Sequence, residues 1–85
     1  MMKEPIKCYA IKDKLNGYAP PIPFLEEELA KRWFKEQVAT NVSIHTTPED
    51  YELYLIGTYV PETATFSNCE RTLIAKGVDY GNNNS

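Results

Sequence analysis

The sequence predicts one small α+β domain over residues 1–80, in which one helix packs on a three-stranded antiparallel or mixed sheet in the order β-α-β-β. Three observations lead to this fold. The chain has 85 residues, a length that supports one hydrophobic core. Two segments alternate their side chains with the period of a strand, and one segment repeats its apolar residues with the period of a helix. The last five residues, 81–85, read GNNNS and are predicted to be a disordered tail.

The first element is a strand, and an unusual connector follows it. Residues 5–12, PIKCYAIK, alternate with period two, and residues 13–17, DKLNG, are typical of a turn. The connector spans residues 15–24, LNGYAPPIPF, where three prolines exclude both a helix and a central strand. Because a mere linker is usually polar, we expect this one to pack against the domain or a partner through its apolar residues Tyr18, Ile22 and Phe24.

The helix is predicted over residues 24–39, where apolar residues recur at spacings of three and four. Acidic residues at its start and basic residues further along complement the helix dipole. Glu27–Lys31 and Glu28–Arg32 have the spacing of favourable ion pairs. The predicted core consists of a helix stripe and the strand residues beneath it, namely Leu25, Leu29, Trp33, Phe34 and Val38 on Ile6, Cys8, Leu53 and Leu55.

Residues 40–47 are predicted to be a loop, with a short extended piece at 42–44. Thr47 and Pro48 are the residue types preferred at the N-cap and at the first helical position. A short helical turn is therefore predicted to begin at Pro48.

A second strand is predicted over residues 51–60, YELYLIGTYV, with apolar residues on both faces and a bulge at Gly57. Such a strand is central in its sheet, or its outer face meets a partner. A hairpin turn at residues 61–63 leads into a third strand, ATFSN. Residues 71–76, RTLIAK, fit either a short helix or a strand, and Gly77 ends them.

The charge is unevenly distributed along the chain. The formal net charge is −3; residues 1–35 carry seven basic and five acidic residues, whereas residues 36–85 carry two and seven. Since nucleic-acid binding depends on neutralising phosphates, an acidic protein is a poor candidate unless its basic groups share one face. An ordinary mixed surface is the simpler interpretation.

The two cysteines, Cys8 and Cys69, lie far apart in the sequence and form no CxxC motif. The first residues lack the apolar core of a signal peptide, and no apolar run reaches the ~20 residues that span a bilayer. We therefore expect an intracellular protein without membrane association, whose thiols are reduced and mostly buried.

The sequence predicts no catalytic residues, no metal site and no cofactor. His45 is the single histidine and is expected to be an exposed or locally hydrogen-bonded loop residue, because a zinc site needs more ligands at workable spacing. The acidic residues near positions 27 and 49 are explained by helix starts. Phosphate-binding, hydrolase and metalloprotease motifs are missing from the sequence. A binding or regulatory role is therefore predicted.

The six tyrosines have two interpretations. Aromatic rings on a sheet can stack the bases of a single strand while nearby lysines contact its phosphates. This interpretation predicts a nucleic-acid-binding set of Lys7, Tyr9, Lys12, Lys14 and Tyr54. The interpretation that we favour is that the tyrosines pack under the helix and fill a protein interface. It predicts a partner interface of Tyr18, Ile22, Phe24, Tyr54, Ile56 and Val60.

Several segments together resemble the small nonstructural protein of gokushovirus-type Microviridae, phages with single-stranded DNA genomes. They are the N-terminal strand, LNGYAPPIPF, EEELAKRWFKEQV and PEDYELYLIGTY, which share their order and spacing with that family over about residues 7–60. PETATF and LIAKG resemble it more loosely.

The resemblance implies the role assigned to protein C of other microviruses, the switch from duplex replicative-form synthesis to production and packaging of single-stranded genomes. It implies no catalytic residues. We therefore expect a non-enzymatic phage accessory protein in the host cytoplasm, a homo-oligomer such as a homodimer, that acts in genome replication or packaging through viral or host proteins or through single-stranded DNA. Two alternatives stay open: an interaction module that captures a host factor without nucleic-acid binding, and a small enzyme or ligand-binding domain.

Overall fold

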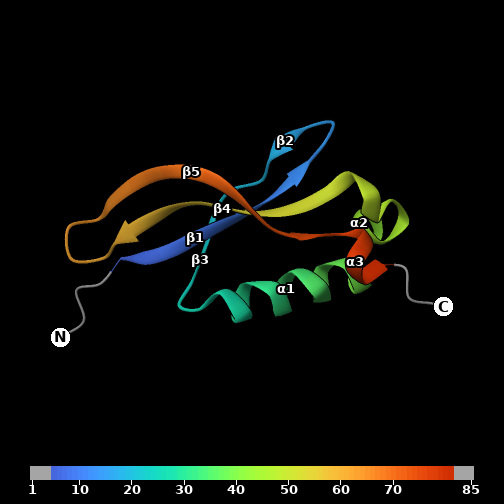
Figure 1. The fold of residues 1–85 in the computed structure, drawn as a ribbon, viewed down its shortest axis with the longest axis horizontal. Coiled ribbons are helices and arrows are strands. Elements are labelled where there is room, and N and C mark those ends of the chain that lie inside the picture. Colours follow the sequence, from blue (N-terminus) through green and yellow to red (C-terminus); the bar gives the residue numbers. More distant parts are fainter. Residues whose placement is uncertain (1–4, 82–85) are drawn as a thin grey trace.

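The computed structural model describes residues 5–81 and shows an α+β domain, in which an antiparallel sheet carries a long helix along one face (Figure 1). The predicted fold class is confirmed, but the described residues form five strands instead of the predicted three. In chain order the elements are β1 (Ile6–Asp13), β2 (Gly17–Tyr18), β3 (Ile22–Phe24), α1 (Glu27–Thr40), α2 (Val42–Thr46), the 3-10 turn η1 (Pro48–Asp50), β4 (Tyr51–Val60), β5 (Thr65–Lys76) and α3 (Val78–Gly81).

The proline-rich connector supplies the two additional strands. β2 and β3 both pair with the free edge of β1, so the sheet order is β2-β1-β4-β5, with β3 also beside β1. In β3, Pro23 pairs with Cys8 of β1; β3 lies at a sheet edge, where the missing N–H of proline is tolerated. Between the two strands, the Ala19 N–H donates to the Ile11 carbonyl oxygen at 2.9 Å. The connector is therefore a docked edge of the sheet, and the predicted order β-α-β-β is incomplete.

Helix α1 begins at Glu27, three residues later than predicted, because Phe24 pairs with β1 as the last residue of β3 and the N-cap Glu26 still has extended backbone. Its buried residues are Ala30, Phe34 and Val38. The predicted contribution of Leu25 and Leu29 to the core is wrong, since these side chains are 76% and 39% exposed. The row of residues spaced by four, Ala30, Phe34 and Val38, therefore makes the main contact with the sheet.

The core lies between α1 and the sheet and contains Tyr9, Leu53 and Ala75 from the three long strands. The predicted contribution of Ile6 and Cys8 to this core is wrong. Cys8 is buried, but it alternates with Tyr9 along β1 and so lies on the sheet face away from the helix. The face of the sheet away from α1 therefore also has buried side chains, the small residues Cys8 and Ala10.

Strands β4 and β5 form a long, irregular hairpin that extends beyond α1 (Figure 1). The predicted bounds of β4 and its bulge are confirmed, since Leu55 pairs with Tyr9 and Gly57 with Cys8, leaving Ile56 as the extra residue. Beyond this bulge the alternation of side chains between the two faces of β4 is therefore shifted by one residue. On the β5 side, Leu55 pairs with Thr72 and Gly57 with Asn68, so residues 69–71 all face Ile56.

Residues 42–46 form the short helix α2 instead of the predicted loop with an extended piece. The Asn41 side chain caps this helix, because its oxygen accepts from the Ser43 N–H at 3.1 Å and the Ile44 N–H at 3.4 Å. The predicted helical turn at Pro48 is confirmed as η1, although the Thr47 hydroxyl donates to the Ser43 carbonyl oxygen instead of capping the turn.

At the C-terminal end, the ambiguous residues 71–76 are part of β5. The sequence prediction missed α3, which ends at Gly81. The remainder of the predicted disordered tail, residues 82–85, lies outside the described residues.

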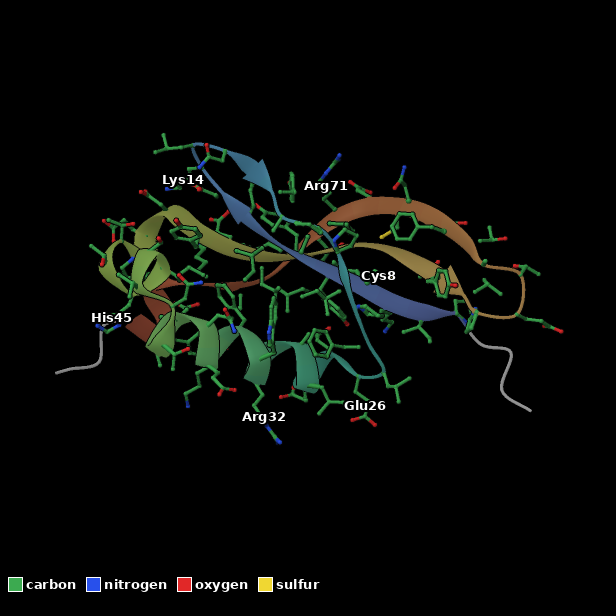
Figure 2. The ribbon with its side chains drawn as sticks, turned by 180° about the vertical axis from the view of Figure 1, so that it is seen from behind. Cys8, Lys14, Glu26, Arg32, His45 and Arg71 are labelled. Atoms are coloured by element: carbon green, nitrogen blue, oxygen red, sulfur yellow. The ribbon has the colours of Figure 1, made fainter. Side chains whose placement is uncertain are left out.

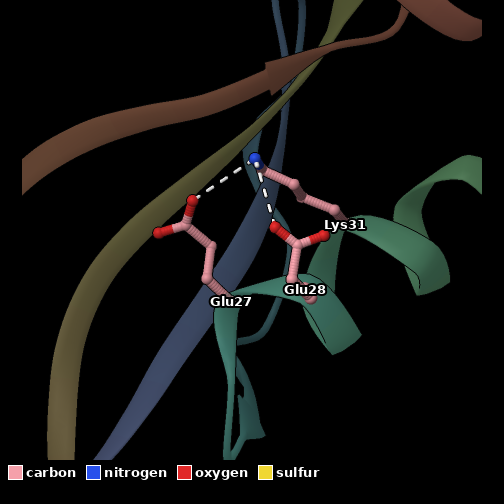
Figure 3. Close-up of polar contacts among 3 residues, drawn as sticks. All are labelled: Glu27, Glu28 and Lys31. Carbon is pink, nitrogen blue, oxygen red and sulfur yellow. Dashed lines mark ion pairs between the residues drawn. The ribbon is translucent and has the colours of Figure 1, made fainter.

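The first turn of α1 carries the predicted ion pair between Lys31 and Glu27, with 3.5 Å between Nζ and Oε2 (Figure 3). The Glu28 carboxylate also meets Lys31, at 3.8 Å, rather than the predicted Arg32. All three side chains are substantially exposed to solvent, so the pairs contribute little stability. In the part of the chain that the structure describes, no helix has the length and apolarity needed to cross a membrane.

Candidate nucleic-acid interface

The sheet face opposite α1 carries a group of aromatic and basic side chains. Residues that pair directly across an antiparallel sheet share a face. Lys12 pairs with Tyr18 on one side, and Ala10 pairs with Tyr54 on the other. Both Lys12 and Ala10 alternate with Ile11, which packs against the helix-side core. Tyr18, Lys12 and Tyr54 therefore lie together on the face away from α1.

Arg71 of β5 completes this group, which we call the tyrosine–cation cluster: Lys12, Tyr18, Tyr54 and Arg71. Figure 2 shows Arg71 on the side of the sheet opposite α1. The rings of Tyr18 and Tyr54 meet edge to face, with 5.7 Å between their centroids. The Lys12 Nζ lies 5.6 Å from the Tyr18 centroid and 6.0 Å from that of Tyr54, and the Arg71 Cζ lies 5.4 Å above the Tyr18 ring. These distances are those of cation–π contacts.

The curl of the sheet brings Arg71 to Tyr18. β2 and β5 are the outer strands of the sheet, with β1 and β4 between them. Extra residues in a strand increase its bend and twist, and β5 has three residues opposite Ile56 at this point. The curl of this face buries the small side chains at its centre, since Cys8 and Ala10 are only 4% and 1% exposed. The cluster therefore lies on a concave surface.

A hollow of about 280 Å³ lies beside the cluster, lined by Tyr18, Ile56, Asn68, Cys69 and Arg71. Cys69 is exposed, so the prediction of mostly buried thiols is wrong for this residue. Cys8 is buried as predicted, and its burial raises the pKa of the thiol.

Glu52 limits the positive charge of the cluster. The Tyr54 hydroxyl donates to the Glu52 carboxylate at 2.9 Å, and this hydrogen bond is the main reason why the pKa of Tyr54 is raised. Glu52 also stands opposite Lys12 in the β1–β4 ladder. The surface thus combines two cations, the half-buried Lys12 and the exposed Arg71, with one carboxylate, an arrangement that suits stacking better than strong phosphate binding.

The structure brings together only some of the predicted nucleic-acid-binding residues. Lys12 and Tyr54 belong to the cluster. Tyr9 is 0% exposed and packs in the core, so its predicted role as a stacking surface is wrong. Lys7 pairs with Phe24, whose ring contacts Trp33 of α1, and so belongs to the helix side of the sheet.

Lys14 lies at the tip of the β1–β2 hairpin (Figure 2). The sequence prediction missed Arg71 because its position depends on the irregular pairing of β5. Only the strand interpretation of residues 71–76, which the sequence left open, would have placed Arg71 on the sheet.

The predicted partner interface is divided between two faces. Tyr18, Tyr54 and Ile56 line the concave face. Phe24 packs on the core, Ile22 lines a separate hollow on the helix side, and Val60 is half-buried at the end of β4. Their role in binding a partner stays a prediction.

His45 is exposed, and its Nδ1 lies 3.2 Å from the Val38 carbonyl oxygen, as expected for a locally hydrogen-bonded residue. Residues 5–81 contain no group of three or more histidine, cysteine or acidic side chains arranged to hold a metal ion.

The family model described as phage ORF5 protein matches residues 6–80. The chain belongs to the phage ORF5 protein family. The match covers the whole sheet and every residue of the tyrosine–cation cluster, so the surface described here is part of the family domain. Neither the curated proteins nor the solved structures contain a match to this ORF5 protein. Family membership identifies it as a phage protein, consistent with the phage resemblance of its sequence.

Proposed function

We propose that this ORF5 protein is a non-enzymatic phage accessory protein that binds single-stranded DNA weakly through its tyrosine–cation cluster. The single observation that carries the proposal is the pair of the exposed Tyr18 and the half-buried Tyr54, flanked by Lys12 and Arg71 on an otherwise acidic protein. The resemblance to the gokushovirus nonstructural protein supports a role in replication or packaging of the single-stranded genome in the host cytoplasm. Viral or host proteins of these processes would be its further partners.

The chemistry of the cluster favours single strands over duplex. An unpaired base can stack on a tyrosine ring, and each such contact contributes ~1–3 kcal/mol. In a duplex the base faces are covered by their neighbours, so the rings would have no equivalent contact. Two cations neutralise two phosphates, which gives a log–log salt slope of about −1.4 on a single strand. The expected binding is therefore weak, dependent on stacking and only mildly sensitive to salt.

Fluorescence anisotropy with a labelled oligo-dT and its duplex, across a salt series, tests this proposal. We expect preference for the single strand, with an affinity loss of roughly 5- to 150-fold on Tyr18→Ala because one stacking contact is removed. Arg71→Gln should weaken binding and reduce the salt slope by about 0.7. Arg32→Gln is the matched control, since it changes the net charge equally but lies on α1, pointing away from the sheet (Figure 2).

Equal effects of Arg71→Gln and Arg32→Gln would show that only net charge matters and would contradict the proposed surface. Tighter binding to the duplex, or no binding at low salt, would contradict DNA binding through the cluster. Either result would favour the interaction module that captures a host factor.

A further inference from the structure

A second and larger hollow lies on the helix side of the sheet, between its β2–β3 edge and the helices α1 and α2. Its volume is about 560 Å³, and its walls include Ile11, Tyr18, Ile22, Trp33, Gln37 and Tyr51. This volume lies in the range of small-ligand sites, which are usually apolar with a few polar groups. The hollow is open to solvent and connector residues form part of its wall, so a ligand could enter without opening of the core.

The lining of this hollow suits a flat heteroaromatic group. Trp33 and Tyr51 provide aromatic faces, while Ile11 and Ile22 provide apolar walls. The polar side chains of the lining include three amides, Asn16, Gln37 and Asn41. The Asn16 amide donates to the Asp13 carboxylate and the Asn41 oxygen caps α2, so Gln37 is the amide best placed to meet a ligand. Recognition of unstacked bases uses this combination of aromatic or apolar stacking with hydrogen bonds to the base edge. A carboxamide can donate and accept at the same time, as the edges of bases require.

Tyr18 connects this hollow to the tyrosine–cation cluster. It lines the 560 Å³ hollow, and its ring also meets that of Tyr54 edge to face on the opposite face of the sheet. Because Tyr18 belongs to the edge strand β2, a strand of DNA that leaves the cluster over this ring meets the hollow next. The two sites are therefore continuous around the edge of the sheet.

We propose that this hollow accepts one unstacked nucleobase of the single strand that the cluster binds, an inference that rests on the proposed function. Trp33 then stacks on the base, and Gln37 contacts its hydrogen-bonding edge. Leu15 and Val42, which are 85% and 78% exposed, neighbour residues of the lining in sequence and would suit a protein partner. An apolar side chain of a protein is therefore the competing occupant that the experiment must distinguish.

Trp33 makes the test direct, because it is the only tryptophan of the chain. The full-length protein is titrated with oligo-dT and with a strand of the same length and charge that contains abasic sites. Anisotropy reports strand binding, while tryptophan emission reports occupancy of the hollow. At equal anisotropy change, we expect the oligo-dT to quench and shift the emission and the abasic strand to leave it unchanged.

Two matched variants test the location. Ala19 is exposed and lines the hollow, so Ala19→Phe should fill it, whereas Ala39→Phe adds the same side chain at an exposed position of α1 outside the lining. Ala19→Phe should abolish the tryptophan response and weaken oligo-dT binding roughly 5- to 150-fold, the effect of one lost base contact. Ala39→Phe should preserve both.

The outcomes separate the two proposals. Strand binding without a tryptophan response, an equal response to the abasic strand, or equal behaviour of the two alanine variants would overturn the nucleobase site and leave the proposed function intact. The absence of strand binding in the anisotropy assay would overturn both proposals and favour the protein occupant.

Discussion

The clearest energetic prediction concerns the hydroxyl of Tyr9. The Tyr9 side chain is 0% exposed, and its hydroxyl has no hydrogen-bond partner among the described residues. Its ring meets that of Phe24 edge to face, with 6.1 Å between the centroids. Tyr9→Phe keeps this packing and removes the buried oxygen. Because a buried polar group without a partner costs ~1–3 kcal/mol, we expect the substitution to raise the free energy of unfolding by about that amount at pH 7.

The same substitution should alter the dependence of stability on pH. Burial raises the pKa of Tyr9, and the negative charge of Glu27 raises it further. A raised pKa in the folded state means that stability is complete below the unfolded value near 10 and is lost as pH rises through the folded value. Tyr9→Phe removes this contribution, so its advantage over the wild type should grow above about pH 10.

Urea unfolding at pH 7 and at alkaline pH measures both effects. Tyr18→Phe is the control, since Tyr18 is 39% exposed and lies at the surface, and its effect should stay within about 0.5 kcal/mol. A loss of stability of 1 kcal/mol or more on Tyr9→Phe would refute the reasoning, because it would mean that an ordered water satisfies the hydroxyl.

Four further predictions follow from the fold. Phe34→Ala should lower the free energy of unfolding by ~3–5 kcal/mol and Leu25→Ala by less than about 0.5, because only Phe34 is fully buried; denaturant melts showing the reverse order would contradict the position of α1. Asn41→Ala should lower the free energy of unfolding by about 1 kcal/mol because it removes the N-cap of α2, and unchanged stability in the same melts would contradict this. The pKa of Asp13 is lowered, mainly because its carboxylate accepts a hydrogen bond from the Leu15 N–H, so the stability that this carboxylate contributes is lost as pH falls through the lowered value. Asp13→Ala should therefore flatten the acid side of the plot of stability against pH, and an unchanged plot would argue against this hydrogen bond. The predicted homo-oligomer should appear as more than the monomer mass in light scattering at high micromolar concentration, and a monomer mass would exclude it.

The sequence predicted the elements whose periodicity is local. The bounds of β4, the position of α1 within three residues and the bulge at Gly57 all follow from side-chain spacing and residue type. The two strands of the connector, β2 and β3, could not be predicted in this way. Prolines exclude a helix or a central strand but do not predict an edge strand, and the pairing with β1 is a long-range contact.

The faces of β1 were assigned wrongly for a related reason. Alternation shows that Tyr9 lies opposite Cys8 and Ala10, but it does not show which set faces the helix. The large Tyr9 fills the space under α1, and the small residues fit the concave side of the curled sheet. For the candidate site, the sequence placed Lys12 and Tyr54 in one predicted set, and the structure brings them together, whereas Arg71 depended on a curl that no local pattern encodes.

The irregular pairing of β5 also bears on how the protein behaves at high concentration. β5 is a 12-residue edge strand, and a straight edge of that length would offer a template for growth of the sheet by further chains. Its ladder with β4 is interrupted between Ala75 and Leu73 and again at residues 69–71. Each interruption changes the direction of the outward-facing N–H and C=O groups of β5, so another chain could pair in register only over short stretches. The distortion that brings Arg71 over Tyr18 thus also protects the protein from edge-to-edge aggregation.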